Sequence, residues 1–253
     1  MKSIESKENP HFKSWKKIAQ NRAKAFVFLE GAHLIQMYAA RFGKVQTLIV
    51  EKNKALSVEN RALVACADEV FLIAENLSRQ LSNLDSPASV FAVCNVPQNA
   101  QNIDFQQNSV LLDGIQNPLN LGAILRVAAA ANFHQVLIAK NSAHVFNPKS
   151  LRAAQGANFL LNIFENADLS DFVKHFQGDI FATCLDSDSK NLFDLTIKTP
   201  TAWIFGAEGQ GIAKDLLKKV NIQKIKISMA QGVESLNVAS AAALCLFECF
   251  RTQ

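Results

Sequence analysis

The sequence predicts an α/β protein whose C-terminal part forms a parallel sheet, preceded by a smaller α/β domain. Regular alternation of strands and helices after residue 104 predicts the sheet. The strands there are short and almost entirely apolar, as expected when helices cover both faces of a parallel sheet. A polar run, Pro97–Asn102, separates two apolar strands. We therefore expect a first domain over 1–97, a linker over 98–103 and a second domain over 104–253.

In the first domain, apolar runs and helical periodicity predict a small α/β arrangement. Strands are expected at 25–29, 47–50, 70–73 and 89–94, and helices at 32–42 and 75–84.

In the second domain, strands and helices follow one another without a repeat or a low-complexity segment. Strands are expected at 109–113, 135–139, 179–184, 201–205 and 224–228, and helices at 121–132, 148–156, 169–176, 212–220 and 236–251.

Positive charge is concentrated at the N-terminus. The net charge of the chain is +4, but residues 1–24 carry seven Lys or Arg against two Glu, a local charge of +5. Such a basic segment on a near-neutral body could anchor a phosphate backbone. Charge alone leaves a solvated, frayed terminus equally open.

The five cysteines are scattered and lack a Cys-x-x-Cys pair or a neighbouring His, so we expect reduced thiols and no metal site. The N-terminus is too polar for a secretory signal. The longest apolar stretch, Val238–Phe247, is too short to span a bilayer. These features predict a soluble, cytoplasmic protein without a membrane partner.

The first candidate motif follows the strand that ends at Asp113. It is Asn117-Pro-Leu-Asn120-Leu-Gly122-Ala-Ile-Leu-Arg126. Asn120 could cap the following helix, and Gly122 and Arg126 share one helix face. Taken alone, a plain helix cap with a surface arginine is the favoured interpretation.

The second motif, Gly206-Ala-Glu208-Gly209-Gln-Gly211, lacks the glycine spacing of a dinucleotide fingerprint. Its glycines indicate positive φ or close ligand contact. Glu208 is either a helix-start carboxylate at Ile212 or a group that points into a site.

The third motif is Ile227-Ser-Met-Ala-Gln-Gly232-Val-Glu-Ser235-Leu236-Asn237. Ser235 could cap a helix whose first turn includes Leu236 and Asn237. All three loops lie at expected carboxyl ends of parallel strands, where ligands bind in open α/β sheets. A shared small-molecule pocket is the simplest account, although the residues alone do not identify the reaction.

In their order and their residues, the three segments closely resemble the motifs of the SpoU (TrmH-like) RNA 2'-O-methyltransferases, which use S-adenosylmethionine. The opening Asn9-Pro10…Lys13…Arg22…Phe28-Leu-Glu30-Gly31 also resembles the family's N-terminal domain. The resemblance implies a trefoil-knotted catalytic domain, an L30e-like RNA-binding domain and a homodimer. It also favours RNA contact for the basic segment.

The resemblance also implies roles for individual residues. The expected catalytic residues are Asn120, Arg126, Glu208, Ser235 and Asn237. The expected cofactor-binding residues are Gly206, Gly209, Ile227, Met229 and Leu236. The expected RNA-binding residues are Asn9, Lys13, Lys16, Lys17, Arg22, Lys24, Lys149 and Arg152.

Arg126 is the family residue most often cast as the base, but a guanidinium stays protonated. We therefore expect it to clamp phosphate and stabilise the developing alkoxide, while phosphate, water or Glu208 accepts the proton. 23S ribosomal RNA is the favoured substrate. The alternatives are tRNA methylation, a non-catalytic RNA-binding assembly factor and, more remotely, a nucleotide-binding metabolic enzyme.

Overall fold

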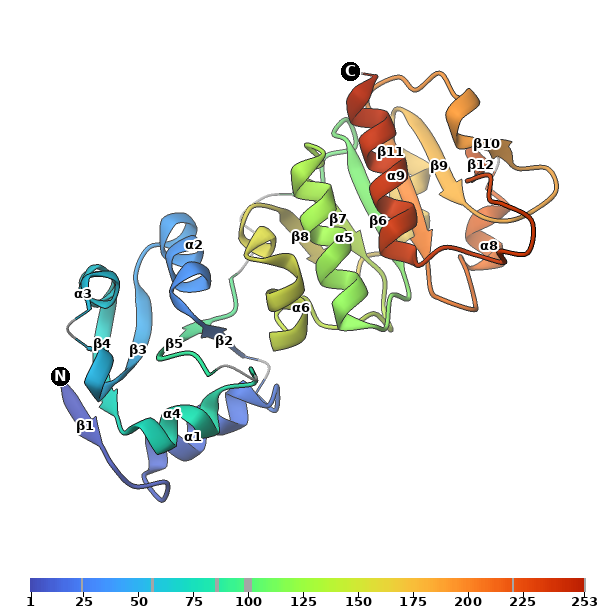
Figure 1. The fold of residues 1–253 in the computed structure, drawn as a ribbon. Helices are drawn as coiled ribbons and strands as arrows, with labels where there is room; N and C mark the ends of the chain where they lie inside the picture. The colour runs from blue at the N-terminus through green and yellow to red at the C-terminus, as the bar shows by residue number, and fades with distance from the viewer. Residues whose placement is uncertain (24, 56, 85–86, 98–101, 220, 253) are drawn as a thin grey trace. The chain divides into compact units, whose positions relative to one another are not determined.

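A computed structural model describes residues 1–23, 25–55, 57–84, 87–97, 102–219 and 221–252. Lys24 and residues 98–101 of the expected linker lie outside the described residues. The chain forms two compact units (Figure 1). The N-terminal unit comprises Met1–Gln98 and Phe146–Phe159, and the C-terminal unit comprises Asn99–Val145 and Leu160–Gln253.

The N-terminal unit contains a five-stranded mixed sheet in the order β1-β4-β3-β5-β2. β5 is antiparallel to β2 and β3, whereas β4 is parallel to β1 and β3. The strands are β1 (Lys2–Ile4), β2 (Phe26–Glu30), β3 (Val45–Glu51), β4 (Ala67–Ile73) and β5 (Val90–Asn95). The helices are α1 (Pro10–Ala19), α2 (Ala32–Phe42), α3 (Val58–Ala65), α4 (Glu75–Leu81) and the 3-10 turn η1 (Lys52–Lys54).

Helices cover both faces of this sheet. Successive side chains of a strand point to opposite faces, and apolar side chains on each face are buried beneath helices. Trp15 of α1 and Leu77 of α4 pack in one buried cluster with Phe28. Ile35 of α2 and Leu63 of α3 pack in the other, with Val27, Leu29 and Leu48. Figure 1 shows α1 and α4 on one side of the sheet and α2 and α3 on the other.

A segment from the middle of the chain completes the second of these clusters. It contains α6 (Pro148–Ala154) and the 3-10 turn η2 (Ala157–Phe159). Leu151 and Phe159 are buried against α2, and the Tyr38 and Phe159 rings lie 5.5 Å apart, edge to face. From the sequence alone, this segment is expected in the second domain. Local periodicity predicts the helix, but its apolar partners lie more than a hundred residues earlier in the chain.

The C-terminal unit is built on a seven-stranded sheet in the order β10-β12-β9-β11-β6-β7-β8. All pairings between its described strands are parallel, so the predicted α/β fold with a parallel sheet is confirmed. The strands are β6 (Ser109–Asp113), β7 (Gln135–Ile138), β8 (Asn162–Glu165), β9 (Asp179–Thr183), β10 (Lys190–Asn191), β11 (Thr201–Gly206) and β12 (Ile222–Lys226).

The helices of the C-terminal unit lie on both faces of its sheet. Phe172 and Leu216, from α7 and α8, pack with Leu111 and Ile204 of the central strands. Figure 1 shows α5 and α9 side by side over a face of the sheet. The helices are α5 (Pro118–Ala130), α7 (Leu169–His175), α8 (Lys214–Leu217), α9 (Val238–Arg251) and the 3-10 turn η3 (Leu192–Asp194).

Several elements were missed by the sequence analysis, namely β1, α1, α3, β8 and β10. Most of them are short, and β1 and β10 have only three and two residues. The signal for α1 was present: Asn9 accepts a hydrogen bond from the His11 amide, and proline follows at the first helical position. All five cysteines are free. Over the described residues, no helix is long and apolar enough to cross a membrane.

Replacing Phe159 with Ala should lower the free energy of unfolding of the N-terminal unit by about 3–5 kcal/mol, because a fully buried ring is lost. Trp15 and Trp203 are the two tryptophans, one in each unit. Urea unfolding followed through Trp15 in a Trp203→Phe background measures the effect. Leu160→Ala, at a neighbouring side chain that is 54% exposed, is the matched control. Equal free energies of unfolding for Phe159→Ala and Leu160→Ala would contradict the assignment of this segment to the N-terminal unit.

Candidate active site

Three loops come together at the carboxyl edge of the parallel sheet. One leads from β6 into α5, one leaves β11 at Gly206, and one runs from β12 to α9. β6 and β11 are direct neighbours, with Asp113 paired to Gly206. The strand order therefore places the first two motifs at adjacent strand ends, where α/β proteins bind ligands.

A hydrogen-bonded contact joins one polar side chain from each loop. Glu208 Oε1 accepts hydrogen bonds from Asn120 Nδ2 at 2.6 Å and from Asn237 Nδ2 at 2.9 Å. Asn237 Nδ2 also lies 3.1 Å from Asn120 Oδ1. Three of the five expected catalytic residues are thus in direct contact. Glu208 is not a helix-start carboxylate, since α8 begins only at Lys214.

Two expected helix caps fall on different residues. Asn117, not Asn120, caps α5 by accepting from the Leu119 amide, because Pro118 occupies the first helical position. The side chain of Asn120 is therefore free to bond Glu208. Asn237, not Ser235, caps α9, since its Oδ1 accepts from the amides of Ala239 and Ser240. Asn237 both begins a helix and joins the polar contact.

The glycine-rich loop is a narrow turn. Ala207 and Gly211 exchange backbone hydrogen bonds at 3.1 and 2.8 Å. A Cβ on Gly206 would lie 2.3 Å from the carbonyl carbon of Gly211, so no larger residue fits there. Gly209 has φ +80°, a conformation that side chains rarely adopt. Close backbone approach therefore explains the glycine at 206, and positive φ explains those at 209 and 211.

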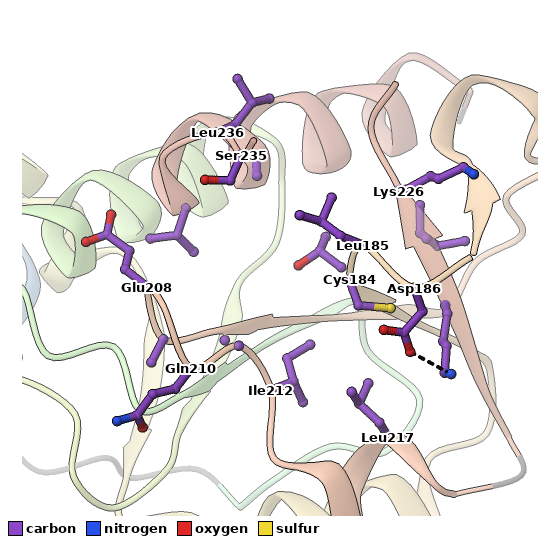
Figure 2. Close-up of a pocket in the computed structure, with 18 of the residues that line it drawn as sticks. Cys184, Leu185, Asp186, Glu208, Gln210, Ile212, Leu217, Lys226, Ser235 and Leu236 are labelled. Carbon is purple, nitrogen blue, oxygen red and sulfur yellow. Dashed lines mark ion pairs between the residues drawn. The ribbon is translucent and has the colours of Figure 1, made fainter. Parts of the chain in front are cut away.

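A cavity of about 930 Å³ opens beside this contact (Figure 2). Its size matches small-molecule sites. All five expected cofactor-binding residues line it, as do Glu208, Ser235 and Asn237. The expected cofactor residues are Gly206, Gly209, Ile227, Met229 and Leu236.

One wall of the cavity comes from a loop that no sequence motif predicted. Cys184, Leu185 and Asp186 follow β9, and Figure 2 shows all three among the lining side chains. Lys224 Nζ lies 2.8 Å from an Asp186 oxygen and 3.1 Å from an Asp188 oxygen. Hydrogen bonds with Asp186, and then with Asp188, raise the pKa of Lys224 above its ordinary value. No glycine-rich motif marks this loop; only the position of β9 beside β11 reveals it.

Arg126 is not brought to this contact. It lies on α5, its side chain is exposed, and it is not a lining residue of the cavity. Within the described part of the chain its guanidinium makes no hydrogen bond or ion pair. It remains available to a ligand that approaches α5 from solvent.

The expected RNA-binding residues fall into two groups within the N-terminal unit. Asn9 caps α1, Lys13 pairs with Glu8 at 2.5 Å, and Lys16 and Lys17 follow on the same helix. Arg22 is exposed just after α1.

Lys149 and Arg152 are exposed on α6. Leu151 of α6 packs on the face of the sheet opposite α1, so the sheet separates the two groups. Lys24 lies outside the described residues. No group of three His, Cys, Asp or Glu side chains suited to a metal was found among the described residues.

Comparisons with known proteins point to one family. Residues 107–247 match the model of the SpoU rRNA Methylase family. The chain is 28% identical to the 23S rRNA (guanosine(2553)-2'-O)-methyltransferase RlmP of Bacillus subtilis, over 98% of each chain. It is 35% identical over 144 residues to the 23S rRNA (guanosine-2'-O-)-methyltransferase RlmB of Ralstonia nicotianae, covering 56% of this chain and 57% of that protein.

Solved structures agree in fold over most of the chain. The SpoU methyltransferase AviRb of Streptomyces viridochromogenes, in complex with AdoMet, superposes with a TM-score of 0.84 at 25% identity, covering 96% of this chain and 98% of that one. The family model covers more than half of the chain and includes all three motifs. This chain belongs to the SpoU rRNA methylase family.

Proposed function

We propose that this protein transfers a methyl group from S-adenosylmethionine to a ribose 2'-hydroxyl of structured RNA in the cytoplasm, with 23S ribosomal RNA as the favoured substrate. The observation that carries the proposal is the contact of Asn120, Glu208 and Asn237 beside a cavity lined by the five expected cofactor residues. The names of RlmP and RlmB, which describe 23S rRNA 2'-O-methylation, support the substrate.

The cavity fits the cofactor in its chemistry. Ile227, Met229 and Leu236 offer apolar surface for an adenine ring, and the turn from Gly206 to Gly211 offers backbone groups. AviRb, which has a similar fold, was solved with AdoMet bound. When bound, the cofactor supplies an electrophilic sulfonium methyl group, and the protein supplies its orientation.

The residues of the contact would orient the reacting groups. Methyl transfer is an in-line displacement, so positioning accounts for much of the rate. Two amide donors fix the Glu208 carboxylate through Oε1, and within the described residues its Oε2 accepts no hydrogen bond. Oε2 can therefore take the proton of the 2'-hydroxyl, directly or through water or phosphate. Asn120 and Asn237 set the direction of that carboxylate.

Arg126 would act from the RNA side. A guanidinium remains protonated and binds phosphate in a bidentate manner. Its exposure on α5 suits a clamp on the phosphate beside the target ribose and a stabiliser of the developing alkoxide. Ser235, which lines the cavity, would contact the ribose or the cofactor through its hydroxyl.

We further propose that the C-terminal unit is a trefoil knot and that the N-terminal unit binds RNA. Family membership and the AviRb superposition over 96% of the chain support both statements. The exposed basic side chains of α1 and α6 supply phosphate contacts. The bounds of the two functional domains are proposed as 1–97 and 104–253, with residues 146–159 folded into the N-terminal unit.

The protein is proposed to be a homodimer. Leu244, Phe247 and Phe250 on α9 are 41–46% exposed and form an apolar face. Exposed apolar clusters of this kind mark interaction surfaces, and self-association through a two-fold axis is the commonest solution.

Labelled methyl groups should pass from S-adenosylmethionine to one nucleotide of unmodified 23S rRNA, found by mapping 2'-O-methyl sites. Arg126→Ala should lower kcat by about 10²–10³-fold, since a transition-state donor is lost, while cofactor affinity stays unchanged. Equilibrium binding of S-adenosylhomocysteine provides the second readout.

Label on tRNA alone would show that the protein is a methyltransferase whose substrate is tRNA rather than 23S rRNA. RNA binding without label on either RNA would support the non-catalytic assembly factor. Full activity of the Arg126→Ala variant would contradict the role given to this arginine.

Phe247→Glu should convert the dimer into a monomer, because it places a charge in the apolar face of α9. Light scattering after size-exclusion chromatography measures the mass. Phe193→Glu, at a phenylalanine that is 55% exposed in η3, should leave the dimer intact. A wild-type chain that elutes as a monomer at micromolar concentration would refute the dimer.

A further inference from the structure

The wall of the cavity formed by the loop after β9 carries none of the three motifs. This loop begins at Cys184, immediately after β9, and reaches Ser189 before β10. β9 pairs in parallel with β11, the strand that ends in the glycine-rich turn. The loop therefore faces the cavity from the strand end next to that turn. Leu185 lines the cavity, yet it is 61% exposed. A ligand bound in the cavity would cover this apolar side chain.

Asp186 is the acidic residue of this wall. Its Oδ2 lies 2.8 Å from Lys224 Nζ, and its side chain remains 50% exposed (Figure 2). Within the described residues, Oδ1 accepts no hydrogen bond. Lys224 belongs to β12, where it pairs with Ala182 of β9, so the ion pair fixes the carboxylate to the sheet. Asp186 is thus held in place through Oδ2, and its Oδ1 can accept a hydrogen bond from a ligand in the cavity.

Apart from Lys224 and Lys226, the lining side chains beside Asp186 are apolar. Figure 2 shows Leu185, Ile212 and Leu217 near it, whereas Glu208 lies across the cavity beside Gln210. If the reacting methyl group faces Glu208, the apolar side is left for the adenosine part of the cofactor. Its neutral donors are the two ribose hydroxyls and the amino group of adenine. In dinucleotide-binding α/β proteins an acidic residue likewise holds a ribose hydroxyl beside the glycine-rich turn.

We propose that Asp186, held by Lys224, accepts a hydrogen bond from a ribose hydroxyl of the cofactor's adenosine and thereby determines cofactor affinity. This assignment rests on the proposed function, because it takes S-adenosylmethionine as the ligand of the cavity. It adds a binding residue from a loop outside the three motifs. Lys224 is a positioning residue, since it acts through Asp186.

The test is a binding cycle that pairs Asp186→Ala with ligands lacking single groups. Calorimetry measures the affinity of wild type and variant for S-adenosylhomocysteine, for 5'-methylthioadenosine, which lacks the amino-acid chain, and for the 2'-deoxy and 3'-deoxy forms of methylthioadenosine. The substitution should weaken binding of the first two ligands on the order of ten- to a hundredfold, as expected for a hydrogen bond to a charged acceptor. It should change binding of at least one deoxy form less than about threefold, because that ligand has already lost the donor.

Asp188→Ala is the matched control. Asp188 also pairs with Lys224, at 3.1 Å, but is not a lining residue of the cavity. It should change no affinity more than about threefold. Thermal unfolding of both variants shows whether they remain folded.

Equal losses for the hydroxylated and both deoxy ligands would overturn the proposal, because Asp186 would then act structurally or through the amino group of adenine. A loss confined to S-adenosylhomocysteine would overturn it in favour of contact with the amino-acid chain. If wild type binds none of the ligands, the proposed cofactor fails and this assignment fails with it. If wild type binds them and Asp186→Ala changes nothing, only the assignment fails.

Discussion

The arrangement of the site depends on the Glu208 carboxylate and its two amide donors. Asn120, in the first turn of α5, and Asn237, the N-cap of α9, lie 88 and 29 residues from Glu208 in the sequence, and both bond Oε1. Asn120 is 9% exposed, so its amide would be costly to leave without a partner. The contact therefore fixes the starts of α5 and α9 against the glycine-rich turn. It also sets the edge of the cavity at which chemistry is proposed to occur.

The double role of Asn237 links folding to the site. Its Oδ1 caps α9 and its Nδ2 donates to Glu208, so one amide serves the helix and the carboxylate together. The narrow turn that carries Glu208 requires a glycine at position 206, where a Cβ would collide with the backbone. These demands explain Gly206 in the second loop and Asn120 and Asn237 in the first and third. Local backbone requirements and ligand binding cannot be separated here.

The sequence was sufficient for the parts of the fold that depend on local pattern. The limits of α2 and β6 agree with the structure because periodicity and neighbouring Gly or Asp residues mark both ends. The expected helix caps, Asn120 and Ser235, were wrong. Asn117 and Asn237 cap α5 and α9 instead, because packing selects between neighbouring residues that can all cap. The wall at Cys184–Asp186 could not be predicted, because it depends on β9 lying beside β11. Strand order is a long-range property.

The segment 146–159 shows the same limit at the level of whole units. Its helical pattern was evident in the sequence, but the burial of Leu151 and Phe159 in the cluster that contains α2 was not. As a result, Lys149 and Arg152 belong to the unit that holds the basic helix α1. The basic side chains of α1 and those of α6 lie on opposite faces of one sheet. Composition and charge counts cannot predict this separation.

The most direct test of the account is the methyl-transfer rate of Asn237→Ser beside Asn237→Ala. Serine is as good a helix cap as asparagine but has no amide to donate to Glu208. Asn237→Ser should stay within about 0.5 kcal/mol of wild-type stability, while its kcat/KM should fall at least about tenfold. Asn237→Ala should show the same loss of rate and a further loss of about 1 kcal/mol in stability. Wild-type activity in Asn237→Ser would contradict the claim that the Glu208 contact organises the site.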